Sequence, residues 1–243
     1  MSRRLTLILA SLLITSACGQ HGAPGKPAAN SETRSPARIL DFALLYGRNC
    51  AGCHGPDGRG GPAIGLGDPV YLAVAGDTVI TRVTADGVPG TAMPAFAQQS
   101  GGMLTGQQVA AIVRGIRSRW AKSDVLRNAE APPYAASQAG DAQRGAGVYG
   151  TFCSSCHGPG GTGGVRAGSI VDGDYLQLVS DQGLRTIVIA GRPDLGAPDW
   201  RGDVPGRPMS PQDVSDVVAW LAAQRPALPG QPDFSARMRG GVR

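Results

Sequence analysis

Cys50-Ala51-Gly52-Cys53-His54 and Cys153-Ser154-Ser155-Cys156-His157 are two copies of one pattern, C-x-x-C-H. This pattern is the attachment site of a c-type haem: two thiols bond the former vinyl groups of the porphyrin, and the adjacent histidine ligates the iron. The two copies use four of the five cysteines and two of the three histidines. The sequence therefore predicts two covalently attached c-type haems, bound by Cys50, Cys53, Cys153 and Cys156 and ligated by His54 and His157.

Three other uses of paired cysteines fit the sequence less well. A four-cysteine zinc site normally holds its two pairs closer together and does not need the following histidine. A thioredoxin-like redox pair would come with a βαβ pattern, which is missing from this sequence. A disulfide closed inside C-x-x-C is strained, and it would not recur with a histidine attached.

The second half of the chain repeats the first. When the two cysteine pairs are laid over each other, further matches follow with single-residue insertions between them: Tyr71 with Tyr175, Gly87 with Gly191, Phe96 with Trp200, and Val109 with Val214. We therefore predict a first repeat at residues 38–121, a linker at 122–138, a second repeat at 139–225 and a C-terminal tail at 226–243.

Helix signals recur in both repeats, and no convincing alternating strand pattern appears, so the sequence predicts an all-α fold with long glycine-rich loops. Ser35-Pro36 suits the start of a helix that runs to the first cysteine pair, and Asp141 suits the start of its counterpart. Thr105 to Gln108 and Ser210 to Asp213 resemble capping boxes that open a last helix in each repeat.

The composition agrees with a fold built around a prosthetic group. Aromatic residues make up only 5% of the chain, whereas it contains 37 glycines and 19 prolines. A large apolar cofactor would supply the missing core. The net charge of +5 favours acidic partners or anionic surfaces. No basic run with interleaved aromatics appears, so we expect no binding to nucleic acid.

Residues 1–17 have the pattern of a secretion signal, with Arg3 and Arg4 before a short apolar run and small residues at its end. Cys18 follows directly, as in the lipobox of bacterial lipoproteins, and would then carry a lipid anchor, although Thr15 departs from that motif. Ordinary cleavage before Cys18 would instead leave a spare thiol. Residues 18–37 are rich in Gly, Pro, Ala and Ser and would form a flexible tether.

Together, residues 38–225 resemble two class I cytochrome c domains in tandem, as in the dihaem cytochromes of bacterial respiratory chains. The resemblance implies that the first and last helices of each domain cross, with a glycine on the first facing an aromatic residue on the last. Gly145 and Trp220 fit that rule. The first repeat has Phe42 and Gly115 instead, so the large and small residues have changed sides, which would keep the contact volume.

The resemblance also implies sixth ligands to the iron. Met93, in Thr-Ala-Met-Pro-Ala-Phe, matches the distal methionine of the family, whereas Met103 is expected to pack in the core. The position matching Met93 in the second repeat is Ala197, which has no donor atom. Met209 is then either a relocated ligand or an apolar staple in the place of Leu104. Water, no ligand, or His21 from the tether are the remaining possibilities.

These features predict an electron-transfer protein on the periplasmic side of a bacterial membrane, and not an enzyme. It would pass electrons between a respiratory-chain or dehydrogenase donor and an oxidase or other acceptor. The alternative is a peroxidase-like dihaem enzyme with an open second haem, and Arg192 and Arg201 flank the relevant loop. No distal His, Arg or Glu constellation supports it, and no spare cysteine supports a thiosulfate-oxidising enzyme.

Overall fold

The computed structural model describes residues 35–202 and 204–226. The predicted signal peptide, Cys18, His21 and most of the tether and tail lie outside these residues. The secondary structure of the described residues consists of helices and two isolated β-bridges, without strands. None of the described helices is long and apolar enough to cross a membrane.

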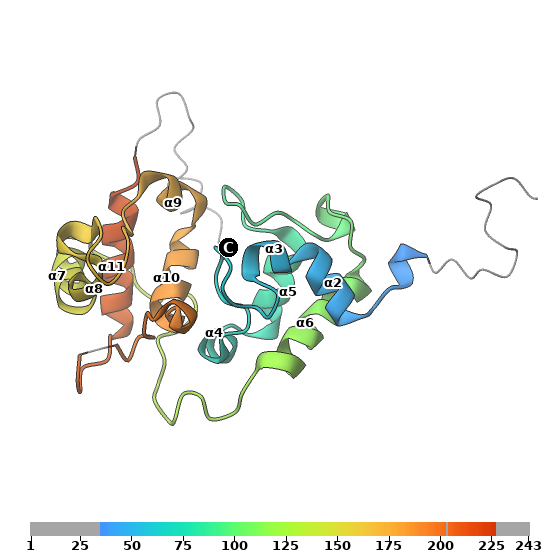
Figure 1. Cartoon of the computed structure of the whole chain (residues 1–243), viewed down its shortest axis with the longest axis horizontal. Helices are drawn as coiled ribbons and strands as arrows, with labels where there is room; N and C mark the ends of the chain where they lie inside the picture. The colour runs from blue at the N-terminus through green and yellow to red at the C-terminus, as the bar shows by residue number, and fades with distance from the viewer. Residues whose placement is uncertain (1–34, 203, 227–243) are drawn as a thin grey trace, which may run out of the picture. The chain divides into compact units, whose positions relative to one another are not determined.

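The two repeats have the same order of α-helices, whereas their short 3-10 helices lie at different positions (Figure 1). The first repeat contains η1 (Pro36–Arg38), α2 (Phe42–Asn49), α3 (Ala51–His54), α4 (Pro69–Val74), α5 (Asp77–Asp86), η2 (Gln98–Ser100) and α6 (Gly106–Trp120). The second repeat contains α7 (Ala142–Phe152), α8 (Ser154–His157), η3 (Pro159–Gly161), α9 (Gly173–Leu178), α10 (Asp181–Ala190), η4 (Pro193–Leu195) and α11 (Pro211–Ala223).

Most of the predicted helix starts are confirmed. Thr105 and Ser210 form capping boxes. Each side chain accepts from the backbone N–H of the residue three positions on, Gln108 or Asp213, and the side chain of that residue accepts from the backbone N–H of the capping residue. Asp141 caps α7 by accepting from the backbone N–H of Arg144 at 2.8 Å. The start predicted at Ser35-Pro36 is wrong. Those residues lead into the short η1, and α2 begins only at Phe42, because the Asp41 carboxylate caps it.

The first and last helices pack against each other in both repeats, α2 on α6 and α7 on α11 (Figure 1). A Cβ on Gly145 would lie 2.1 Å from the carbonyl oxygen of Asp216 and 2.7 Å from the Cβ of Trp220. A Cβ on Gly115 would lie 2.0 Å from the ring of Phe42. The exchange of large and small residues is therefore confirmed: each crossing has one glycine, on opposite helices.

Trp120, at the end of α6, was missed in the sequence comparison. It makes an edge contact with Tyr46, at 5.0 Å between ring centroids, while Trp220 stacks on the matching Tyr149 at 4.4 Å. Trp120 lies more than one helical turn beyond Gly115, the residue aligned with Trp220. A tryptophan of the last helix therefore contacts the equivalent tyrosine in both repeats, but from different positions along that helix.

Candidate haem-binding sites

Each C-x-x-C-H pattern forms one short helical turn at the end of a longer helix. Cys50 caps the end of α2 and Cys153 caps the end of α7. The backbone N–H of His54 donates to the carbonyl of Cys50 at 3.0 Å, and that of His157 donates to the carbonyl of Cys153 at the same distance. This turn brings both thiols and the imidazole to one place. The four cysteines of the two patterns are free thiols.

The two histidines are oriented in the same way. The distance from Nδ1 of His54 to the carbonyl oxygen of Ile64 is 2.8 Å, and Nδ1 of His157 lies 2.8 Å from the carbonyl oxygen of Gly168. A carbonyl can only accept, so Nδ1 carries the proton in both rings. In the neutral tautomer that this bond selects, Nε2 has a lone pair for a metal, as in other metal-binding histidines.

Burial shifts the pKa values of His54 and of the first cysteine in each site. His54 is buried, and this burial lowers the pKa of its imidazole, which keeps the ring neutral as a ligand must be. Burial also raises the pKa of the Cys50 thiol to about 11, and that of the Cys153 thiol to about 11. Both groups are therefore thiols at neutral pH. At the first site, a neutral Cys50 thiol and a neutral His54 imidazole in one helical turn fit the attachment of a c-type haem.

The backbone around Met93 lies against the C-terminal end of α5. The backbone N–H of Val88 donates to the carbonyl of Met93 at 3.0 Å, and that of Phe96 donates to the carbonyl of Ala85 at 3.1 Å. Gly87 has a φ of +68°, and a Cβ there would lie 2.7 Å from the carbonyl oxygen of Met93. Only glycine allows this approach. Met93 itself is half-buried.

The second repeat reproduces this backbone around Ala197. Gly191 has a φ of +72°, and a Cβ there would lie 2.8 Å from the carbonyl oxygen of Ala197. The backbone N–H of Trp200 donates to the carbonyl of Ile189 at 3.0 Å, as that of Phe96 does at the matching carbonyl. The structure thus places Ala197 where the first repeat has Met93.

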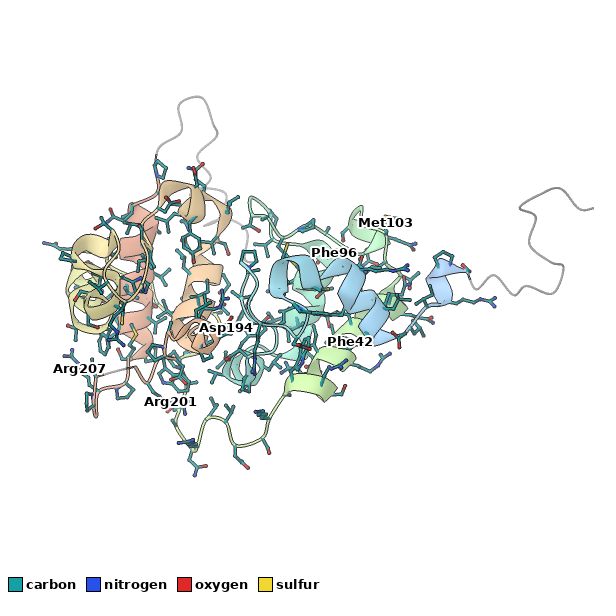
Figure 2. The ribbon with its side chains drawn as sticks, in the orientation of Figure 1. Phe42, Phe96, Met103, Asp194, Arg201 and Arg207 are labelled. Atoms are coloured by element: carbon teal, nitrogen blue, oxygen red, sulfur yellow. The ribbon has the colours of Figure 1, made fainter. Side chains whose placement is uncertain are left out.

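Met209 and Leu104 also occupy matching places. The backbone N–H of Met209 donates to the carbonyl of Trp200 at 2.8 Å, and that of Leu104 donates to the carbonyl of Phe96 at 2.7 Å. Both side chains are buried in the apolar core. Met103 differs from expectation: its side chain is 88% exposed, so the prediction that it packs in the core is wrong (Figure 2). Leu104, the residue directly after Met103, is buried instead.

The two arginines near Ala197 are both paired with acids. Arg192 forms an ion pair with Asp194 at 2.9 Å, and Arg201 pairs with Asp199 (Figure 2). The Arg192 guanidinium lowers the pKa of the Asp194 carboxyl to about 2. The guanidinium of each arginine is therefore held by a carboxylate of the same loop.

The same loop is bonded to the first repeat. The backbone N–H of Gly60 donates to Oδ2 of Asp194 at 2.9 Å, and Nη2 of Arg192 donates to the carbonyl of Gly61 at 2.9 Å. Gly60 and Gly61 belong to the loop that leads from His54 to Ile64, whose carbonyl orients the histidine. The sequence carried no signal for this contact, because its partners in the first repeat are backbone groups.

Comparison with known proteins finds the same family in both repeats. The family model described as "Cytochrome C oxidase, cbb3-type, subunit III" matches residues 37–114 and again residues 140–221. The chain belongs to this family. It is a dihaem c-type cytochrome with two cytochrome c domains in tandem, it binds two c-type haems, and it transfers electrons through them.

One relative in the family is the cbb3-type cytochrome c oxidase subunit CcoP of Azospirillum sp. (strain B510). It is 32% identical over 158 residues, which are 58% of this chain and 48% of the relative. The chain thus spans about half the length of this relative. A chain of the reducing HAO-like protein complex of Kuenenia stuttgartiensis aligns with a TM-score of 0.41 and 17% identity, covering 76% of this chain and 96% of that one.

Proposed function

We propose that this cytochrome receives electrons from a respiratory-chain or dehydrogenase donor and passes them to an oxidase or another acceptor on the periplasmic side of a bacterial membrane. The name of the Azospirillum relative, an oxidase subunit, supports an oxidase as one redox partner. The haem iron supplies the one-electron chemistry when bound. The residues of this chain hold it, orient its ligand and set how easily it is reduced.

At the first site, Cys50 and Cys53 would form the thioether bonds to the haem, and His54 and Met93 would ligate its iron. The second site uses Cys153 and Cys156, with His157 as the proximal ligand. The observation that carries this assignment is the repeated geometry: each C-x-x-C-H turn ends in a histidine whose Nδ1 is bonded to a backbone carbonyl at 2.8 Å. This bond fixes the ring and raises its basicity as a ligand.

Positive charge supports docking to acidic partners. The whole chain has a net charge of +5 at pH 7 and a sequence pI of about 9.2, and two of its positive charges, Arg3 and Arg4, belong to residues 1–17. A basic surface attracts acidic faces at long range, and salt weakens that attraction because the Debye length falls to about 10 Å at 0.1 M.

The function is tested by voltammetry of the holoprotein adsorbed on a carboxylate-terminated electrode. We expect two one-electron waves, one for each haem, and we expect the adsorbed amount to fall as the salt concentration rises. A hydroxyl-terminated electrode is the control for the charge dependence. A single wave, or waves that are absent from protein with full haem content, would contradict a two-haem electron carrier.

We also propose that residues 1–17 export the chain and that Cys18 carries its lipid anchor. The apolar run followed directly by a cysteine supports this proposal. In cells that express the full chain, we expect Cys18→Ser to move the haem-stained protein from the membrane fraction to the soluble periplasmic fraction. If the variant stays in the membrane fraction, another segment or a partner holds it there.

A further inference from the structure

We propose that the second haem site leaves the position opposite His157 open to a small neutral ligand, because Ala197 stands where the first site has its methionine. This inference rests on the proposed function, since it concerns the same dihaem protein. It assigns different tasks to the two sites: the first holds both axial ligands from the chain, and the second takes one of them from solution.

The loop around Ala197 has the same backbone geometry as the loop around Met93. In each repeat a glycine with positive φ, Gly87 or Gly191, lies against the carbonyl of the residue in question. Three residues later in each repeat, the backbone N–H of an aromatic residue donates to a carbonyl near the end of the preceding helix. The distance is 3.1 Å for Phe96 and 3.0 Å for Trp200. The loop that presents Met93 is thus preserved around Ala197, whose methyl group has no lone pair to donate.

Met209 is the only methionine between His157 and α11, and so the candidate for a relocated ligand within the second repeat. The backbone N–H of Met209 donates to the carbonyl of Trp200 at 2.8 Å, and that of Leu104 donates to the carbonyl of the equivalent Phe96 at 2.7 Å. Met209 directly precedes the capping Ser210, and the residue at the matching staple position, Val214, is fully buried. Leucine and methionine exchange in cores with little change in volume. Met209 therefore packs as Leu104 does.

The charged side chains of the loop around Ala197 are paired with one another. The charged side chains between Gly191 and Gly202 form two ion pairs, Arg192 with Asp194 and Arg201 with Asp199. Each arginine is thus already bound to a carboxylate of the loop, whereas cleavage of peroxide requires an acid–base group that is placed to move a proton at the iron. The loop therefore suits a neutral diatomic molecule and not peroxide.

The test is a titration of the reduced holoprotein with carbon monoxide, followed by the Soret absorption. We expect one carbon monoxide per chain for the wild type. Ala197→Met supplies the missing thioether and should weaken the binding at least tenfold. Met209→Leu copies the residue of the first repeat, and it should leave the stoichiometry and affinity unchanged.

Two results would overturn the inference. One is a wild type that takes up no carbon monoxide while Met209→Leu takes up one, since Met209 would then be the sixth ligand. The other is Ala197→Met that binds carbon monoxide as the wild type does. Haem content and far-UV circular dichroism of each variant show whether it has folded. If the voltammetric waves persist while either result is found, the electron-transfer function stands and only the open site is refuted.

Discussion

Replacing Met93 with alanine should remove the methionine-to-iron charge-transfer band of the oxidised protein and lower the potential of the first haem. A thioether opposite histidine stabilises reduced iron, so its loss favours the oxidised state. We expect the potential to fall by more than about 59 mV, which corresponds to a tenfold change in a one-electron equilibrium. Near-infrared absorption and potentiometric titration of the holoprotein measure the two effects.

Met103→Ala is the matched control for this substitution. Met103 belongs to the same repeat, but its side chain is 88% exposed, so the band and both potentials should be unchanged. The size of the change at Met93 also reports on the second haem. If Met93→Ala removes only half of the band, a second methionine ligates iron and Met209 is that residue. An intact band would contradict ligation by Met93.

Replacing Gly145 with alanine should destabilise the second repeat by about 1–3 kcal/mol or more, the usual cost of overpacking a core. The new Cβ would lie 2.1 Å from the carbonyl oxygen of Asp216, which belongs to the backbone of α11 and cannot rotate away. The two helices would have to separate. For a domain of this size, each kcal/mol lowers the Tm by roughly 4–8 °C. Denaturant or thermal unfolding of the holoprotein gives the value.

Gly147 and Gly115 provide the comparisons. Gly147 lies on the same helix and a Cβ there meets nothing within 4 Å, so Gly147→Ala should be neutral or stabilise by about 0.5–1 kcal/mol. The atoms nearest to a Cβ on Gly115 belong to the ring of Phe42, a side chain that can move, so Gly115→Ala should cost less than Gly145→Ala. Equal stability of the Gly145 and Gly147 variants would show that this helix crossing is not close-packed.

Much of the site could be predicted because its chemistry requires particular residue types at fixed spacing. Two thiols and an imidazole must meet on one helical turn, so both haem sites were identified from the C-x-x-C-H pentapeptides. The replacement of Met93 by Ala197 was visible for a similar reason, since the repeat supplies its own internal alignment. The glycine–aromatic exchange followed from the same alignment, because close packing conserves volume.

Other parts of the site depend on backbone atoms, which leave no mark on residue identity. The acceptors that orient His54 and His157 are the carbonyls of Ile64 and Gly168, and any residue could supply them. The bond from Gly60 to Asp194 joins residues far apart in the chain. Such contacts exist only once the loops have folded.

The sequence by itself determined the all-α tandem fold, the two haem sites and the missing methionine of the second repeat. Only the tertiary structure decided that Met103 faces outward, that Met209 and Leu104 are both buried, and that α2 starts after Asp41. The physical reason is the same in each case. Covalent and ligand chemistry selects residue types, whereas burial and capping depend on which neighbours the folded backbone brings within a few ångströms.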